Sequence, residues 1–512
     1  MTGDLGLKIA RNSVYNFLRT FINIPITLAI IPYTVKHLGK EDFAIWALVG
    51  VISSYARLSD FGITESLIKF FAEHKERNDA RRMNQLINTS ISVYLLLSAL
   101  CYTLMVIILP FIVDKVLNIP PELQSKALYV FNLAIALFFI NLSLSVFSSL
   151  IIGFLRAEFS NMIALISSLL TAVGTFFFIH QGYGLAGLVY NNAIVTVFVV
   201  TANIIAAKHL FPRMQINLIT HFSKETLKQI FGFSWKIQLT NITQLMIFQI
   251  DRVLLSHYVG LNAVSNYEIA NRVSLQAMSF IASIFRPLVP AASSLQAASK
   301  NESMAGLYRR SFKYMSLLSI FISFLIIALA HPFVRTWMGP GYETSAFTMQ
   351  LLTAVYMITL LTGPGVFILN GMNKPHISMR SSIMAGMTNL ILCLALVQWF
   401  GYYGIIIGIS FSIISSGIYF LWMVHRNVPG LSWSVYRQTL AWPIAISIVL
   451  SSLLLIINML FHLQGYFMLF GFGVLYFIIA AIFIMQSSFF DDFDRAILAK
   501  LIPLRWINFS RN

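Results

Sequence analysis

Long apolar stretches recur along the whole chain, and short polar clusters separate them. About 20 apolar residues are enough to cross the hydrocarbon core of a bilayer as one α-helix. Of the 512 residues, 58% are apolar and only 11% are charged, which is too little charge to cover the surface of a soluble protein of this length. The sequence therefore predicts an all-α polytopic membrane protein and excludes a fully soluble one.

We predict about 14 transmembrane helices, and the loops between them are too short to form a soluble domain. The predicted spans lie near residues 12–35, 43–66, 83–113, 126–153, 159–180, 184–207, 229–256, 264–296, 311–331, 345–370, 376–399, 402–424, 438–459 and 464–487.

Basic residues are distributed unevenly between the predicted loops. With a cytoplasmic N-terminus, 24 of the 35 Lys and Arg residues fall on the cytoplasmic side and 5 on the opposite side. Cytoplasmic loops carry an excess of Lys and Arg, and a miscounted span would scramble this asymmetry. We therefore expect an even number of spans with both termini in the cytoplasm. The basic run "KERNDARR" then marks orientation, and we expect no binding of nucleic acid.

A weak internal repeat suggests how the spans are organised. Gly39 and Gly260, 221 residues apart, each follow an aliphatic helix end and precede a polar turn and an aromatic residue. This spacing predicts two parallel six-helix lobes around a central cavity, a transporter architecture, followed by two further helices. The predicted parts are an N-lobe (1–210), a cytoplasmic linker (211–228), a C-lobe (229–425), the last two spans (436–488) and an interfacial tail (489–512).

Apart from Lys and Arg residues near span ends, which are counted with the loops, ten charged residues lie inside predicted spans, where an ionised side chain costs about 2.5–3.5 kcal/mol and usually faces the protein interior or a water-filled cavity. They are Arg19, Arg57, Lys236, Arg252, Arg272, Arg286, Asp60, Glu65, Asp251 and Glu268.

Local ion pairs are one explanation of these charges. Arg57 and Asp60 lie three residues apart and Glu268 and Arg272 four apart, so each pair can meet on one helix face. Asp251 can instead cap or pair near the outer surface. Arg19, Lys236 and Arg286 have no acidic residue within one turn. A cavity for an anionic substrate explains these three better.

Enzymatic functions find no support in the motifs. The "DFG" at 60–62 lacks the other kinase segments, and Gly62 more simply allows a bend or close packing. No long loop, paired carboxylates or metal-ligand spacing is present, and we read "DDFD" at 491–494 as the solvated start of a helix. We expect no cofactor and no metal. Cys101 and Cys393 both lie in apolar spans, as small core residues do.

Three segments resemble the oligosaccharide flippases of the multidrug/oligosaccharidyl-lipid/polysaccharide exporter superfamily, which includes bacterial O-antigen repeat-unit flippases. They are "YTVKHLGKEDFAIWALV", "LSDFGITESLIKFFAEH" and "FGFSWKIQLTNITQLMIFQIDRVLLSHYVGLNAVSNYEIANRV". The resemblance covers the whole chain in architecture and these segments in motif.

The resemblance implies movement of undecaprenyl-pyrophosphate-linked oligosaccharides across the bacterial cytoplasmic membrane by alternating access, for cell-surface polysaccharide synthesis. It implies as partners the lipid-linked glycan, membrane lipid and polysaccharide polymerase machinery. It also implies a cationic substrate cavity, here formed by Arg19, Arg57, Lys236, Arg272 and Arg286. Asp60, Asp251 and Glu268 remain either ion-pair partners or carriers of a coupling ion.

Two other transport functions remain open. Drug/cation antiporters of the same superfamily often carry an acidic residue in the first helix, but no Asp or Glu lies between Asn12 and Lys36 here. The buried basic residues would also repel a cationic drug. A flippase for lipid-linked peptidoglycan precursor would suit the same cationic cavity, so the sequence discriminates poorly against it.

Overall fold

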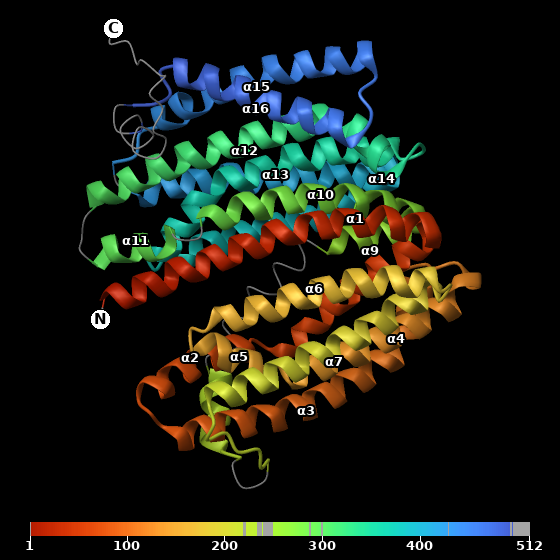
Figure 1. The fold of residues 1–512 in the computed structure, drawn as a ribbon, viewed down its shortest axis with the longest axis vertical. Helices are drawn as coiled ribbons and strands as arrows, with labels where there is room; N and C mark the ends of the chain where they lie inside the picture. Colours follow the sequence, from red (N-terminus) through yellow and green to blue (C-terminus); the bar gives the residue numbers. More distant parts are fainter. Residues whose placement is uncertain are drawn as a thin grey trace. The chain divides into compact units, whose positions relative to one another are not determined.

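The computed structural model describes residues 2–218, 222–232, 238, 249–285, 288–297, 301–428, 430–491 and 494, with side chains from residue 22 onward at most of these positions. These residues form helices joined by turns and short loops, and no strand occurs among them (Figure 1). The predicted all-α fold is confirmed for this part of the chain.

Most of these helices follow one another with short connections, and between α7 and α9 only part of the chain is described. In chain order they are α1 (Thr2–Ala56), η1 (Arg57–Asp60), α2 (Ile63–Glu76), α3 (Ala80–Phe111), η2 (Ile112–Val116), α4 (Pro121–Ser143), α5 (Ser145–Gly153), α6 (Ala157–His180), α7 (Gly184–Leu210), α9 (Ile250–Tyr258), α10 (Leu261–Phe285), α11 (Leu288–Ala297), α12 (Asn301–Met338), α13 (Glu343–Gly371), α14 (Pro375–Asn427), α15 (Ser434–Phe461) and α16 (Tyr466–Gln486).

Nine helical segments within the described ranges are long and apolar enough to cross a membrane. They are α3 with η2, α4, α6, α7 and each helix from α12 to α16. One of them, α14, has 53 residues, and the non-helical backbone angles at Gly401 divide it into the segments 375–400 and 402–427, each long enough at 1.5 Å per residue to cross the bilayer core once. A polytopic membrane protein is therefore confirmed, and the total of about 14 spans stays a prediction.

Two glycines divide the longest helices at the predicted loops. Gly39 in α1 has φ 84° and ψ 170°, and Gly401 in α14 has φ 53° and ψ −124°. Side chains with a Cβ rarely adopt such positive φ values, whereas glycine does so readily. The kinks coincide with the predicted boundaries between spans 12–35 and 43–66 and between spans 376–399 and 402–424.

The predicted span 43–66 ends earlier than expected. The α-helix stops at Ala56, a 3-10 turn covers Arg57–Asp60, and both Phe61 and Gly62 have left-handed backbone angles before α2 begins. Arg57 and Asp60 therefore lie in a sharp turn between two helices rather than within a continuous membrane helix. The prediction that Gly62 allows a bend is confirmed by its φ of 76°.

The described residues form two compact units. The first, unit 1, comprises residues 1–276 and 379–416. In it α6 packs on α7 and on α1, α3 packs on α4, and α4 packs on α7, so these helices run alongside one another (Figure 1). On α3, large apolar side chains such as Leu96, Leu100 and Ile107 are 64–72% exposed, as expected for a lipid-facing surface.

Two further close contacts join elements of unit 1. Gly153 in α5 lies so close to α2 that a Cβ there would be 2.8 Å from the backbone oxygen of Ile68. The guanidinium of Arg82 donates two hydrogen bonds to Glu225, at 3.0 and 3.2 Å. These bonds hold the pKa of the Glu225 carboxyl below its usual value.

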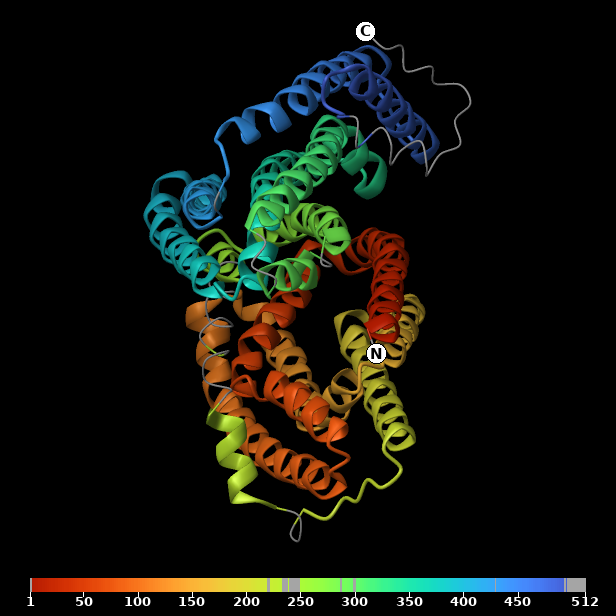
Figure 2. The ribbon, with the colours of Figure 1, turned by 90° about the vertical axis from the view of Figure 1, so that its left-hand side faces the viewer.

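The second unit, unit 2, comprises residues 277–378 and 417–512. In it α12 is the central helix, since it packs against α11, α13, α15 and α16. Figure 2 shows α15 and α16, in blue, next to each other. One core cluster surrounds Tyr308 and Phe312, and another surrounds Phe321 and Tyr476. The boundaries between the two units fall inside α10 and α14 and differ from the predicted lobe boundaries. The two six-helix lobes therefore stay a prediction.

Candidate functional site

Asp60 is the buried centre of a hydrogen-bonded cluster in unit 1. Its side-chain oxygen Oδ1 accepts hydrogen bonds from the hydroxyls of Tyr94 and Thr64 and from the backbone N–H of Thr64 at 3.2 Å. The backbone N–H of Thr64 lies in the first turn of α2, where backbone donors have no partner within the helix. Asp60 therefore joins the turn after α1 to α3 and to the first residues of α2.

Arg57 and Asp60 do not form the ion pair that their spacing allows. No residue that the structure describes makes a salt bridge or hydrogen bond to the exposed Arg57 guanidinium, while the Asp60 carboxylate is occupied by Tyr94 and Thr64. The 3-10 turn between them explains this, because it changes the angle at which their side chains project. Arg57 instead lines a cavity of about 430 Å³.

This cavity, the Arg57 cavity, is built entirely from unit 1. It is lined by the turn at Arg57–Asp60 and the start of α2, by α4 and α5, and by α7. Asn141 from α4 and Asn192 from α7 contribute carboxamides, and Phe138 contributes an aromatic ring. The carboxylates of Asp60 and Glu65 line it too, and Asp60 is occupied by Tyr94 and Thr64. The guanidinium, the carboxamides and the aromatic ring suit a ligand that carries both an anion and hydroxyl groups.

Other asparagines in these helices have structural roles. Asn88 donates to the backbone oxygen of Gln215 and accepts from the backbone N–H of Asn217, each at 2.7 Å, and so holds the segment after α7 against α3. Asn191 donates to the backbone oxygen of Thr171 at 2.9 Å and joins α7 to α6. The sequence could not separate these residues from Asn141 and Asn192.

A second charged cluster lies at the junction of α9 and α10, also in unit 1. Glu268, whose side chain is 2% exposed, forms salt bridges with Arg252 at 2.7 Å and with Arg272 at 2.5 Å. The predicted pair of Glu268 and Arg272 is confirmed. The additional pairing with Arg252, 16 residues away, has no local sequence signal because it depends on the turn between the two helices.

Asp251 is buried rather than placed at a surface. Its two oxygens accept hydrogen bonds from the Tyr267 hydroxyl at 3.1 Å and from the Asn389 carboxamide at 3.0 Å. The Arg252 guanidinium also lies 5.5 Å from the centre of the Tyr267 ring. Asn389 belongs to α14, so sequence reasoning gave no reason to connect it with Asp251.

Three predicted cationic residues are outside what the structure describes. Arg19 lies on α1, but its side chain is not among the described ones, and Lys236 and Arg286 fall between the described ranges. Arg272 is described, and its side chain is 48% exposed although it is paired with Glu268.

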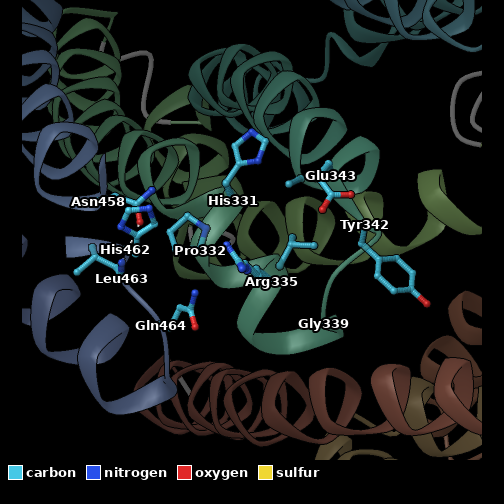
Figure 3. A pocket seen from close by; sticks show the side chains of 12 residues that line it. His331, Pro332, Arg335, Gly339, Tyr342, Glu343, Asn458, His462, Leu463 and Gln464 are labelled. Carbon is cyan, nitrogen blue, oxygen red and sulfur yellow. Dashed lines mark hydrogen bonds between the residues drawn. The ribbon is translucent and has the colours of Figure 1, made fainter. Parts of the chain in front are cut away.

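A smaller cavity of about 180 Å³ lies in unit 2, where α12 and α15 end and α13 begins. Figure 3 shows Asn458 and His462 on one side of it and Tyr342 and Glu343 on the other. No predicted site residue is among the described residues that line it. The Arg57 cavity therefore remains the better candidate for a substrate site.

A model of the polysaccharide biosynthesis protein family matches residues 9–296, more than half of the chain. The chain belongs to this family. The family resemblance inferred from the three sequence segments is thus confirmed. A second family model, MatE, matches residues 237–395.

Curated relatives are similar to the chain over most of its length, and a solved structure is similar to it in fold. An uncharacterized membrane protein of Methanocaldococcus jannaschii is 21% identical over 82% of this chain and 84% of its own length. A putative O-antigen transporter of Shigella flexneri is 22% identical over 82% of this chain and 98% of its own. The structure of the lipid II flippase MurJ, in an inward closed conformation, has a TM-score of 0.69 at 14% identity, covering 93% of this chain and 99% of that one. At this identity the likeness shows the fold.

Proposed function

We propose that this family member is a flippase for undecaprenyl-pyrophosphate-linked oligosaccharide repeat units. It moves them from the cytoplasmic to the periplasmic leaflet of a bacterial inner membrane by alternating access, for cell-surface polysaccharide synthesis. Membership of the polysaccharide biosynthesis family supports this function, as does the similarity to an O-antigen transporter. The protein performs transport and no covalent chemistry, and both termini lie in the cytoplasm.

The observation that carries the proposal is the Arg57 guanidinium at the wall of a polar cavity. A pyrophosphate is a dense anion, and a guanidinium can donate two parallel hydrogen bonds to it. Arg57 is available because Asp60 bonds to Tyr94 and Thr64. The low dielectric constant of a membrane protein strengthens the attraction further.

The rest of the cavity suits the glycan. The carboxamides of Asn141 and Asn192 can both donate to and accept from sugar hydroxyls, and Phe138 offers an apolar face to a sugar ring. We propose that Arg19, Lys236, Arg272 and Arg286 supply further positive charge along the substrate path. We assign Glu268 to an ion-pair role and leave Asp60 and Asp251 as candidates for ion coupling.

Two alternatives have specific support. The MatE match favours a drug/cation antiporter, and the fold similarity to MurJ favours a flippase for lipid-linked peptidoglycan precursor. The free guanidinium of Arg57 argues against the first, because it repels cations. The second has an anionic lipid-linked substrate, so only a comparison of substrates separates it from the proposed function.

The test is transbilayer movement in proteoliposomes that contain the full chain. The probe is a fluorescent undecaprenyl-pyrophosphate oligosaccharide, and a membrane-impermeant quencher reports the fraction in the outer leaflet. We expect flipping by the wild type, a loss of about 10–100-fold in Arg57→Gln at 1.5–3 kcal/mol per charged hydrogen bond, and partial retention in Arg57→Lys. Arg77→Gln, at an exposed residue outside the cavity, is the matched control.

The outcomes separate the candidates. Preferred movement of the peptidoglycan precursor, or of a cationic dye, would replace the proposed substrate with that one. Normal flipping by a folded Arg57→Gln variant would remove Arg57 from the substrate path.

A further inference from the structure

A large basic cavity in unit 2 is not explained by the transport site. Its volume is about 890 Å³. It is enclosed by the first turns of α12, the first turns of α15 and the segment that follows α16. We call it the α12–α15 cavity. Basic residues dominate its charge, since Arg309, Arg310, Lys313 and Arg437 line it together with a single acidic residue, Asp491.

Among these cations, Lys313 forms salt bridges with acidic residues beside the cavity, with Asp494 and, at 3.6 Å, with Asp491. Burial alone would raise the pKa of Asp494, but hydrogen bonds from Lys313 and Tyr314 outweigh burial and hold this pKa below its usual value. The two acidic groups are thus occupied by Lys313, so the remaining positive charge of the cavity comes from its arginines.

The arginines present their guanidinium groups at the cavity wall. Arg309 donates one hydrogen bond to the backbone oxygen of Gly430 at 2.6 Å, which fixes its side chain and leaves other N–H donors. Arg437 is exposed, and it makes no ion pair with any residue that the structure describes. Arg309, held in place by Gly430, and Arg437, which is exposed, thus bring two guanidinium groups into one cavity. Such a pair of guanidinium groups can bind a phosphate group.

The cavity lies at the depth of lipid headgroups. Both α12 and α15 are membrane-spanning candidates, and the lining residues lie about 8–18 Å from the start of α12 and about 2–12 Å from the start of α15. Trp442, which is 45% exposed, lies at the cavity and donates from Nε1 to the Ser488 hydroxyl at 3.1 Å. Tryptophan with a wet polar end and an apolar ring is typical of the membrane interface.

An exposed apolar stripe continues from this cavity along α15. Val449, Leu453 and Ile456 follow Trp442 at intervals of 7, 11 and 14 residues, and all are 45–66% exposed. These spacings place the four side chains on one face of the helix. A ligand held in the cavity by its phosphate therefore has a continuous apolar surface beside it for acyl chains.

We propose that the α12–α15 cavity binds the phosphate headgroup of an anionic glycerophospholipid, with its acyl chains along the exposed face of α15. The positive-inside asymmetry assigns these helix ends to the cytoplasmic leaflet, where anionic lipids attract basic sites. The site does not depend on the proposed transport function, because it shares no residue with the Arg57 cavity.

Native mass spectrometry of the full chain in detergent tests this site. The probes are phosphatidylglycerol, phosphatidylcholine and inorganic phosphate, each titrated separately. We expect phosphatidylglycerol to bind more tightly than phosphatidylcholine, and we expect each arginine removed to weaken it about fivefold, at about 1 kcal/mol per residue. Arg437→Gln removes one charge without breaking an ion pair, and Arg309→Gln/Arg437→Gln removes two, for a loss of about 25-fold.

The matched control is Arg77→Gln/Arg81→Gln, which removes the same charge from exposed residues at the end of α2 and the start of α3. Selective loss in the cavity variants alone supports the proposal. Equal affinity for the two lipids, equal weakening in the control, or competition by inorganic phosphate at the lipid's own affinity would each overturn it. Arg437→Gln keeps the test valid if the double variant fails to fold.

Discussion

Replacing Glu268 by Gln tests the charged cluster at α9 and α10 most directly. Glu268 is the shared partner of Arg252 and Arg272, and its side chain is 2% exposed. Glutamine keeps the size of the side chain but removes the charge. Arg252, 8% exposed, then loses its salt bridge to Glu268 but keeps its contacts to Gln249 and to the ring of Tyr267. Breaking a buried salt bridge by removing one partner costs about 3–5 kcal/mol, so we expect a loss of that size in the free energy of unfolding.

The neighbouring variants should be much milder. The Arg272 side chain is 48% exposed, and solvent screens a pair of that kind, so Arg272→Ala should cost only about 0–1 kcal/mol. The double variant Arg252→Met/Glu268→Met removes both charges of the buried salt bridge and retains apolar volume. It should therefore lose less stability than Glu268→Gln alone, because the salt bridge is replaced by apolar groups and is not broken on one side only.

Thermal unfolding of the purified full chain in one detergent, followed by size-exclusion chromatography of the folded fraction, measures this order. At about 2 °C per kcal/mol, Glu268→Gln should lower the midpoint by roughly 6–10 °C. The reasoning would be refuted if Arg272→Ala were as destabilising as Glu268→Gln. It would also be refuted if Arg252→Met/Glu268→Met were more destabilising than Glu268→Gln alone.

Three further predictions concern the backbone and an exposed pair. Gly401→Ala should lower the free energy of unfolding by about 1–3 kcal/mol because Gly401 has a positive φ. Gly471→Ala, in an open position on α16, should leave the stability unchanged or increase it. Equal thermal midpoints for the two variants would contradict this. Gly153→Ala should lower the midpoint more than Gly471→Ala does, because its Cβ would lie 2.8 Å from a backbone oxygen of α2; an unchanged midpoint would show that this contact gives way. Because Arg82 lowers the folded-state pKa of Glu225, the salt bridge between them should be present at neutral pH and lost as the pH falls through that pKa. Since both side chains are exposed, the thermal midpoints of the wild type and of Arg82→Gln, compared across pH, should differ little. A large difference at neutral pH would count against this.

Local sequence patterns predicted the features that depend on neighbours along the chain. The apolar runs predicted membrane helices, and Gly39 marked the end of one because few other residues tolerate its backbone angles. The Glu268–Arg272 pair was predictable because residues four apart share a helix face. The same rule failed for Arg57 and Asp60, since it assumes an α-helix and the chain forms a 3-10 turn there.

By itself, the sequence determined the helical membrane class, most helix boundaries and the family, since each follows from apolar run length, glycine placement and short motifs. Only the tertiary structure decided which polar residues meet. Tyr94 reaches Asp60 across 34 residues, Asn389 reaches Asp251 across 138, and Arg309 and Arg437 share a cavity although they lie on different helices. The physical reason is that a charge inside a membrane protein must find a partner or a polar cavity, but helix packing, and not local spacing, determines which of these it finds.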